Sequence, residues 1–344
     1  MTLAFSRTLV TGAAGFIGAA VVERLLARGG YVVGFDNLDA ATGTAIKRAR
    51  LARLTPPHFE FVTGDIVDAE ALARAADLAT PIDTIVHLAA RVGVRASLDD
   101  PRGFAETNAV GFTNVLELGR RRQVAHVVYA SSSSVYGANR EVPYHASQAS
   151  DHPLSFYAAT KRGNELMAHS FSHLYGLPTT GLRLFTVYGP WARPDMALCT
   201  FAERMVLGLP IDIFGDGGMQ RDFTYRDDVA DAIVHVLASP PSETMNGARQ
   251  PHESSAPFRV LDVGAGHPIA ITALIGLLET ALGVSAERRY LPMQAGDMRT
   301  TWADASALER LVGWRPSVTI EEGVAAFARW YRDVGFDITR GAPR

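Results

Sequence analysis

The sequence contains very little cysteine, little net charge and no long apolar segment. Its single cysteine, Cys199, excludes an intrachain disulfide framework and a cysteine-rich metal site, and it favours a reducing, cytoplasmic environment. We expect no metal and no nucleic acid, because the formal net charge is only -3 and the basic run 47–53 is interpreted as the solvated side of a helix. No N-terminal apolar run reaches membrane length, so neither a signal peptide nor a membrane span is expected.

What is present indicates an α/β protein. Hydrophobic residues make up 47% of the 344 positions, enough core for two domains or for one domain with a lobe attached. Strand-like runs alternate with helix-like runs through the first 185 residues, which predicts a doubly wound parallel sheet of the Rossmann type. The expected strands are 7–11, 31–36, 59–63, 83–90, 124–130 and 179–185, and the longest expected helices are 104–122 and 155–175.

The regular alternation ends after residue 185. We expect a loop over 186–195, helices near 197–207, 269–282, 304–311 and 320–331, and a strand near 211–214. The run 259–263 is expected to be one more strand that returns to the large sheet. The predicted organisation is a Rossmann domain over 1–185, to which 221–240 and 258–264 return, and a smaller C-terminal α/β lobe, mainly 186–340.

A glycine-rich turn directly follows the first expected strand. Gly12, Gly15 and Gly18 separate this strand from an apolar-periodic helix, with the spacing G-x-x-G-x-x-G. Glycines permit a tight turn and a close approach of the backbone to a pyrophosphate, whose charge the helix N-terminus stabilises. A purely structural turn is the alternative, but the strand before it and the helix after it favour a dinucleotide site.

The ends of the next strands carry polar residues. Asp36 closes the second strand about twenty positions beyond Gly18, where the dinucleotide fingerprint places an acid on the adenosine ribose. Its charge would repel a 2′-phosphate and no arginine directly follows it, so NAD is expected rather than NADP. Asp65 follows the third strand and is assigned either to the adenine amino group or to the cap of the next helix. His87 lies inside an apolar strand and is interpreted as a core histidine rather than a catalytic one.

A tyrosine and a lysine point to the chemistry. Tyr157 and Lys161 are one helical turn apart within 155–175, so they share one face of that helix. A phenol has a pKa of about 10, and lowering it by about three units takes roughly 4 kcal/mol, which the Lys161 cation and a cationic nicotinamide ring would supply together. A solvated helix face is the alternative for this pair alone. The serine run 131–134, at the carboxyl end of the fifth strand, places hydroxyl groups at the same crevice.

With these motifs in this order, the chain resembles the extended short-chain dehydrogenases/reductases that modify nucleotide sugars, the NAD-dependent epimerase/dehydratase family. The stretches 185–197 and 221–228 resemble those of UDP-glucuronate 4-epimerases. Thr186 is a departure from related glucose epimerases, which carry asparagine at this position. The resemblance implies a catalytic set of Tyr157, Lys161 and Ser132. It implies a cofactor set of Gly12, Gly15, Phe16, Ile17, Gly18, Asp36, Asn37, Asp65, Ile66, Leu88, Ala89, Ala90, Tyr157 and Lys161. It implies a substrate set of Arg95, Ser132, Ser133, Ser134, Tyr157, Thr186, Arg193, Met196, Arg221 and Asp297.

The implied activity is the 4-epimerisation of UDP-glucuronate to UDP-galacturonate. Tyr157 would take the proton of the sugar 4-hydroxyl with help from Ser132, and NAD would hold the C4 hydride until it is returned. Ser133, Ser134, Thr186 and Arg193 would bind the sugar carboxylate. The resemblance also implies a homodimer formed through 104–122 and 155–175. A UDP-glucose 4-epimerase, a UDP-glucuronate decarboxylase, a 4,6-dehydratase and a non-catalytic NAD-binding sensor remain alternatives, although the serine run lacks the acid that a dehydratase needs.

Overall fold

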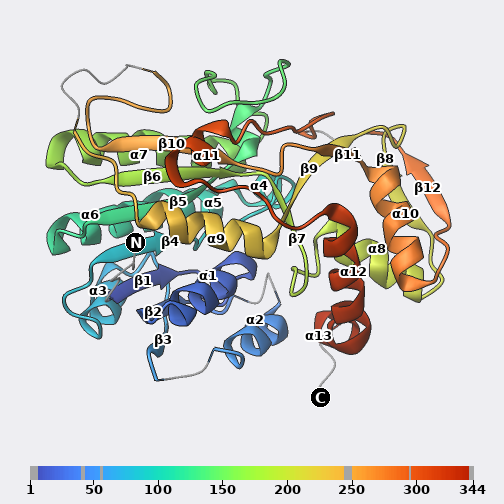
Figure 1. Cartoon of the computed structure of the whole chain (residues 1–344), viewed down its shortest axis with the longest axis horizontal. Coiled ribbons are helices and arrows are strands. Elements are labelled where there is room, and N and C mark those ends of the chain that lie inside the picture. The colour runs from blue at the N-terminus through green and yellow to red at the C-terminus, as the bar shows by residue number, and fades with distance from the viewer. Residues whose placement is uncertain (1–6, 40–42, 55–56, 244–249, 294–295, 341–344) are drawn as a thin grey trace.

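A seven-stranded parallel sheet forms the centre of the molecule (Figure 1). The computed structural model describes residues 7–39, 43–54, 57–243, 250–293 and 296–340. The strand order β10-β6-β5-β4-β1-β2-β3 is that of a doubly wound sheet, which confirms the predicted fold class. The strands are β1 (Arg7–Thr11), β2 (Tyr31–Asp36), β3 (Phe59–Thr63), β4 (Thr84–His87), β5 (His126–Ser132), β6 (Thr179–Leu184) and β10 (Phe258–Val263).

Strand β10 pairs in parallel with β6, so the chain does return to the large sheet as expected. Strand β4 is shorter than the expected run 83–90, because the chain leaves the sheet after His87.

Helices cover both faces of this sheet. One face carries α1 (Phe16–Ala27), α9 (Arg226–Leu237) and α11 (Ser306–Val312), and the other carries α3 (Ala69–Asp77), α6 (Phe112–Arg122) and α7 (Phe156–Tyr175). Neighbouring strand residues alternate between the two cores: Leu9 packs in one and Val10 in the other, as do Val127 and Val128. This alternation is the period of two expected of a sheet buried on both sides.

The helix expected over 104–122 is interrupted. It comprises α5 (Pro101–Ala105), a π-helical segment (Glu106–Gly111) and α6, and it follows the short α4 (Ala96–Asp99). π-helical turns inside longer helices occur frequently at functional sites. This segment carries Asn108, whose side chain hydrogen-bonds the segment after β4 and helix α7.

A smaller lobe lies beside the large sheet, on the right of Figure 1. It has a three-stranded sheet in the order β11-β9-β7 and a parallel pair of β8 and β12. The expected loop over 186–195 is wrong at its start, because Thr186–Tyr188 forms β7 and pairs in parallel with β9. The elements of the smaller lobe are β7, α8 (Ala197–Val206), β8 (Ile211–Phe214), β9 (Gln220–Tyr225), β11 (Pro268–Ala270), α10 (Ile271–Leu282), β12 (Arg288–Leu291), α12 (Ile320–Trp330), a π-helical segment (Tyr331–Gly335) and α13 (Phe336–Thr339).

The basic run lies in helix α2 (Thr44–Leu51) and in the turn after it, and the solvated interpretation is wrong for two of its residues. Lys47 and Arg50 are buried, whereas Arg48 is exposed. Positions i and i+3 share one side of a helix, and here that side faces the protein, where each cation finds hydrogen-bond acceptors. Among the helices of the described residues, none is both long and apolar enough to span a membrane.

Candidate active site

The glycine turn lies where the strand order reverses, at the carboxyl ends of β1 and β4. Gly12 has a φ of +73°, and a Cβ there would come within 2.6 Å of the Ala89 nitrogen. A Cβ on Gly18 would lie 2.0 Å from the Gly12 carbonyl oxygen, so both positions need glycine. Helix α1 begins at Phe16, and its N-cap, Gly15, contributes no side-chain hydrogen bond. The N–H groups of the first turn, which include Ile17, are therefore not capped by Gly15 and suit an anion.

Asp36 lies buried at the end of β2 beside this turn. Its Oδ2 accepts a hydrogen bond from the Ala14 nitrogen at 3.2 Å, and its Oδ1 accepts from the Leu38 nitrogen at 2.8 Å. Lys47 Nζ donates to the same Oδ1 at 2.9 Å. These bonds hold the carboxylate rigidly at the place where the sequence predicts the adenosine ribose.

Asn37 and Asp65 meet at the ends of β2 and β3, where Asn37 Nδ2 donates to Asp65 Oδ2 at 2.9 Å. The alternative in which Asp65 caps α3 is wrong, because the N-cap is Asp68, whose Oδ1 accepts from the backbone of the first turn. Asp65 instead accepts from the Val67 nitrogen at 3.0 Å. The neighbouring Ile66 is buried against the π-helical segment.

Residues 88–90 continue from β4 along the glycine turn. The Leu88 nitrogen donates to the Thr11 carbonyl at 3.0 Å, and the backbone of Ala89 lies against Gly12. Ala90 follows and is partly buried. His87, one residue earlier, is a buried core histidine as interpreted, because its Nδ1 lies 2.8 Å from Thr11 Oγ1. Burial and the nearby Lys161 lower the pKa of His87 to about 3, so it is neutral.

Tyr157 and Lys161 occupy the first two turns of α7, whose N-cap Ser155 accepts a hydrogen bond from the Ala158 nitrogen at 3.1 Å. Lys161 is buried, and its Nζ donates to the Ala130 carbonyl at 2.9 Å. Burial lowers the pKa of Lys161 to about 8. Burial also raises the pKa of Tyr157, while the Ser132 hydroxyl and the charge of Arg193 act in the opposite direction. In the protein alone, the phenol is therefore protonated at neutral pH.

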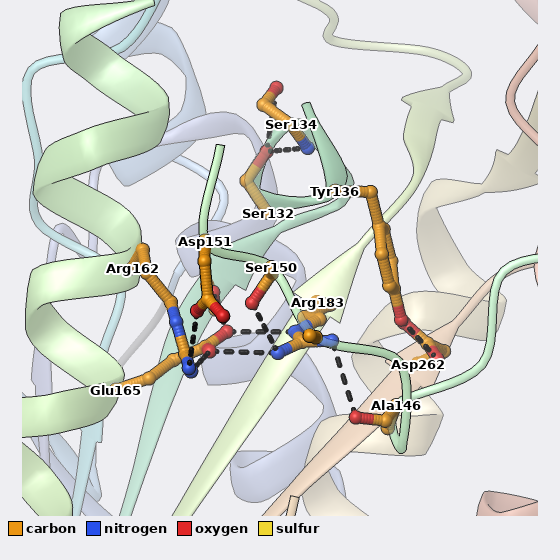
Figure 2. Close-up of polar contacts among 12 residues, drawn as sticks. Ser132, Ser134, Tyr136, Ala146, Ser150, Asp151, Arg162, Glu165, Arg183 and Asp262 are labelled. Atoms are coloured by element: carbon orange, nitrogen blue, oxygen red, sulfur yellow. Dashed lines mark hydrogen bonds and ion pairs between the residues drawn. The ribbon is translucent and has the colours of Figure 1, made fainter. Parts of the chain in front are cut away.

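The serine run ends β5 and enters a short 3-10 turn, Ser133–Tyr136. Ser132 Oγ donates to Ser134 Oγ at 3.1 Å and accepts from the Ser134 nitrogen at 3.2 Å (Figure 2). Ser131 faces elsewhere, because its Oγ donates to Glu165 Oε1 at 2.6 Å. Ser132 is the hydroxyl of this strand end that is a hydrogen-bond partner of Tyr157.

A buried ion pair lies next to the end of β5 and stabilises it. Arg183 of β6 donates Nε to Glu165 Oε1 and Nη2 to Glu165 Oε2, both at 2.9 Å, and neither side chain is exposed (Figure 2). Arg162 Nη1 donates a second bond to Oε2 at 2.9 Å. With the bond from Ser131, four hydrogen bonds compensate the burial of the carboxylate, and they join β5, β6 and α7.

A second buried pair fixes the other end of the 3-10 turn. The Tyr136 hydroxyl lies 2.7 Å from each oxygen of Asp262 in β10, and the Arg183 guanidinium stacks on the Tyr136 ring, 4.8 Å from its centroid. Burial raises the pKa of Asp262 to about 7, although Arg183 opposes this shift. The turn that carries Ser132–Ser134 is thus held at both ends by buried polar groups.

A cavity of about 130 Å³ opens beside this turn. Five residues of the substrate set line it: Ser133, Ser134, Thr186, Arg221 and Asp297. Burial lowers the pKa of Arg221, and the charge of Asp297 opposes that shift, so the two groups interact. Ligand pockets for drug-sized molecules run to roughly 300–1,000 Å³, so this cavity fits only part of a nucleotide sugar. The remaining lining residues are Val94, Gly137, Leu154, Ser155, Gly296, Met298 and Thr301.

Five residues of the substrate set do not line this cavity: Ser132 and Tyr157, described above, and Arg95, Arg193 and Met196. Arg95 stacks over Phe214 of β8, with its Cζ 4.9 Å from the ring centroid. Arg193 donates Nε and Nη2 to Asp195 at 3.0 and 3.1 Å. Met196 is partly buried, packs against the large core and is the N-cap of α8. Arg193 nevertheless lies close enough to Tyr157 for its charge to lower the pKa of the phenol.

Sequence reasoning missed Asn108 and Arg50. Asn108 donates Nδ2 to the Arg91 carbonyl at 3.0 Å and to Thr160 Oγ1 at 3.1 Å, so it ties the segment after β4 to α7. Arg50 donates to the Ala14 carbonyl at 3.0 Å and to the Trp191 carbonyl at 3.1 and 2.7 Å. The spacing of Lys47 and Arg50 on one helical side was the available signal. Within the described ranges, no group of three or more His, Cys, Asp or Glu side chains could hold a metal ion.

A glycine turn at the switch point of a doubly wound sheet, an acid closing β2, and a Tyr157–Lys161 pair facing a serine at the end of β5 define a short-chain dehydrogenase/reductase. The chain belongs to the NAD dependent epimerase/dehydratase family, whose model matches residues 8–247.

Individual relatives cover nearly the whole chain. A probable UDP-glucuronate 4-epimerase of Rhizobium meliloti (strain 1021) is 46% identical over 330 residues, which is 94% of this chain and 96% of the relative. The crystal structure of UDP-glucuronic acid 4-epimerase from Bacillus cereus, in complex with UDP-glucuronic acid and NAD, is 32% identical with a TM-score of 0.84, covering 95% of this chain and 99% of the other.

A dTDP-glucose 4,6-dehydratase from Streptomyces venezuelae with NAD bound is similar to the same degree, at 32% identity and a TM-score of 0.84, covering 96% and 98%. The backbone therefore does not separate the two activities.

Proposed function

We propose that this chain is a UDP-glucuronate 4-epimerase that interconverts UDP-glucuronate and UDP-galacturonate with NAD as its cofactor. The family, the 46% identity to a probable UDP-glucuronate 4-epimerase over 94% of the chain, and the likeness to a solved enzyme of that name support this activity. The observation that carries the choice of reaction is the end of β5. It carries the hydroxyls of Ser132, Ser133 and Ser134 and no carboxyl group, and Ser132 is a hydrogen-bond partner of Tyr157.

The residues around the glycine turn fit a dinucleotide. The N-terminus of α1, which has no side-chain cap, suits the pyrophosphate. The backbone of Ala89 lies close to Gly12, so only backbone separates β4 from the glycine turn. Hydrogen bonds fix Asp36 at the position that we assign to the ribose. We assign Gly12, Gly15, Phe16, Ile17 and Gly18 to the pyrophosphate. We assign Asp36, Asn37, Asp65 and Ile66 to the adenosine half, and Leu88, Ala89, Ala90, Tyr157 and Lys161 to the nicotinamide half. In this division, residues 1–185 with 221–240 and 258–264 hold NAD, and 186–340 mainly hold the nucleotide sugar.

NAD, when bound, supplies the hydride acceptor and donor for C4 of the sugar. Tyr157 takes the proton of the 4-hydroxyl, with Ser132 hydrogen-bonded to the same oxygen, and later returns that proton. Burial leaves Tyr157 protonated in the protein alone, so its action as a base requires additional positive charge near the phenol. Lys161, held by the Ala130 carbonyl, is positioned to contribute that charge. For C4 to be inverted, the 4-keto sugar would have to turn its opposite face to the site before Tyr157 returns the proton.

The substrate is assigned to the cavity beside the 3-10 turn. In this assignment Arg221 binds the diphosphate, and Asp297 and Arg95 also contact the nucleotide sugar. Ser133, Ser134 and Thr186 converge on one cavity and are placed to donate hydrogen bonds to the sugar carboxylate. Arg193 completes this carboxylate site by exchanging Asp195, which is largely exposed, for the substrate. Met196 contributes apolar contact at the start of α8.

The test is incubation of the purified protein with UDP-glucuronate and no added NAD, followed by ion-exchange chromatography of the sugar nucleotides. We expect UDP-galacturonate to form until equilibrium and NAD to be released on denaturation of the protein. A UDP-pentose product would indicate a decarboxylase, and loss of water would indicate a dehydratase. Equal turnover of UDP-glucose in a parallel reaction would favour a neutral-hexose epimerase. Binding of NAD without conversion of any sugar nucleotide would indicate a sensor.

We also infer a homodimer formed through the helices of the α6 and α7 face. Leu166 and Leu174 of α7 are 57% and 63% exposed, and Val110 of the π-helical segment is 51% exposed. Side chains of this size and exposure on adjoining helices are suited to burial against a second copy. Light scattering after size-exclusion chromatography should give twice the mass of the 37.0 kDa chain, and Leu166→Glu with Leu174→Glu should give the monomer. We place the protein in the cytoplasm, since its one cysteine is a buried free thiol, and cell fractionation would test this.

A further inference from the structure

Lys47 lies beside the carboxylate that the sequence assigns to the adenosine ribose. Its Nζ is 2.9 Å from Asp36 Oδ1, and both side chains are almost completely buried. Asp36 is the only hydrogen-bond partner of this ammonium within the described part of the chain, although an ammonium has three donors. The local charge at the end of β2 is therefore close to zero rather than negative.

Helix α2 is fixed in place by two further basic residues, Arg50 in its last turn and Arg53 just beyond its end. Arg50 donates to the carbonyls of Ala14 and Trp191, which joins α2 to the glycine turn. Arg53 pairs with Glu23 of α1 at 3.0 Å and stacks on the Trp191 ring, 4.6 Å from its centroid. These contacts hold the C-terminal end of α2, and Lys47 itself is buried, so the position of Lys47 is set by the fold and not by a mobile surface side chain.

The Lys47–Asp36 ion pair alters how the charge at this site acts on NAD and NADP. A lone carboxylate at the ribose both accepts a hydrogen bond from the 2′-hydroxyl and repels a 2′-phosphate. With Lys47 in contact, most of that repulsion is cancelled, because the opposite charges are separated by a single hydrogen bond in a site with little water. A group that hydrogen-bonds Asp36 is also brought within a few ångströms of the ammonium, and lysine is an effective phosphate ligand.

We propose that Lys47 is a second residue that determines cofactor specificity. Its ammonium is suited to bind a 2′-phosphate, and the ion pair with Asp36 keeps it from doing so. This inference rests on the proposed NAD site. The carboxylate excludes NADP by holding the ammonium and filling the space at the ribose, not by local negative charge. Removal of the carboxylate alone therefore exposes a preformed cation to the phosphate, and removal of both groups leaves a neutral site that favours neither cofactor by charge.

The experiment compares wild type with Asp36→Ser, Asp36→Ser/Lys47→Met and Asp36→Ser/Arg48→Met. Arg48 is exposed on the same helix, so its loss changes the net charge equally without touching the site. Each purified protein is incubated with rising concentrations of NADP against a fixed concentration of NAD. The bound nucleotides are then separated by chromatography after desalting and denaturation, which measures binding and not turnover.

We expect Asp36→Ser to improve binding of NADP relative to NAD by about tenfold to a hundredfold, the value of a hydrogen bond to a charged group. Asp36→Ser/Lys47→Met should lose most of this gain, and Asp36→Ser/Arg48→Met should keep it. If the Lys47→Met double variant retains the full gain, Lys47 has no role and the inference is overturned while the NAD site stands. If Asp36→Ser changes the binding of neither nucleotide, the placement of the ribose is wrong, and the proposed cofactor site fails with it.

Circular dichroism and thermal unfolding establish that each variant is folded. Asp36→Ser/Lys47→Gln provides a second neutral variant should the methionine destabilise α2, and Asp36→Ser/Lys47→Arg should retain the gain because it keeps a cation at this position.

Discussion

Replacing Glu165 by glutamine should destabilise the fold far more than a change of one charge at the surface. Glu165 accepts two hydrogen bonds from Arg183, one from Ser131 and one from Arg162, and it is completely buried. Glutamine has nearly the same shape but leaves the buried Arg183 guanidinium without its counter-charge, and it turns an N–H donor toward another donor. Breaking one side of a buried ion pair costs about 3–5 kcal/mol, against a total stability of about 5–15 kcal/mol for a typical domain.

The measurement is unfolding in urea followed by circular dichroism, with two controls. Glu117→Gln removes a carboxylate of α6 that pairs with Arg120 and Arg121 at the surface, and it should cost less than about 1 kcal/mol. The double variant Glu165→Met/Arg183→Met removes both charges, so it should cost less than Glu165→Gln alone. A cost of Glu165→Gln no larger than that of Glu117→Gln would show that the buried pair is not coupled as the geometry indicates.

Three further predictions concern the reaction and its pH dependence. Tyr157→Phe should lower kcat by roughly 10² to 10⁴ and leave the affinity for UDP-glucuronate nearly unchanged in calorimetry, because only the proton acceptor is removed; wild-type turnover would reject Tyr157 as the base. Arg193→Ala should lower kcat/KM for UDP-glucuronate by about tenfold or more and have little effect on kcat/KM for UDP-glucose. Asp195→Asn should lower the KM for UDP-glucuronate. Steady-state kinetics with both substrates test this, and an equal loss of kcat/KM for the two substrates in Arg193→Ala would contradict the carboxylate assignment. The folded-state pKa of Asp262 is raised to about 7, above its unfolded value. The stability that its protonated form provides is therefore complete below about pH 4 and is lost as the pH rises to about 7. In urea unfolding, Asp262→Asn should gain stability relative to wild type between pH 5 and pH 8, and a difference that stays constant with pH would count against this pKa.

Periodic patterns predicted the large sheet well, because a parallel strand buried on both faces is a short apolar run with a clear beginning and end. Strands β1, β2 and β3 have the predicted bounds, and the seventh strand near 259–263 was also expected. The smaller lobe was less predictable. Strand β7 has three residues, and it exists because its partner β9 lies beside it, which is a tertiary fact that the local sequence does not contain.

The site was predictable where function imposes a residue type at a fixed spacing, as in the glycine turn and the Tyr157–Lys161 pair. It was not predictable where one side chain serves two distant segments. Lys47 and Arg50 resemble an exposed basic helix in a linear sequence, and only the fold shows that their acceptors come from β2, the glycine turn and the Trp191 segment. Asn108 is a similar case, since its partners lie in another loop and another helix.

The choice between epimerase and dehydratase depends on very few atoms, because a dehydratase and a uronate epimerase match this backbone equally well. Both reactions begin with a 4-keto sugar, but a dehydratase must then protonate a departing oxygen and remove a proton from C5, which takes an acid and a base. The 3-10 turn offers Ser133 and Ser134, whose hydroxyls do neither at neutral pH. Asp297 is the one carboxylate among the described residues that line the cavity, and it interacts with Arg221. In the proposed reaction Tyr157 is the proton partner of the 4-keto sugar, and the side chains that line the cavity supply no acid and base for the loss of water.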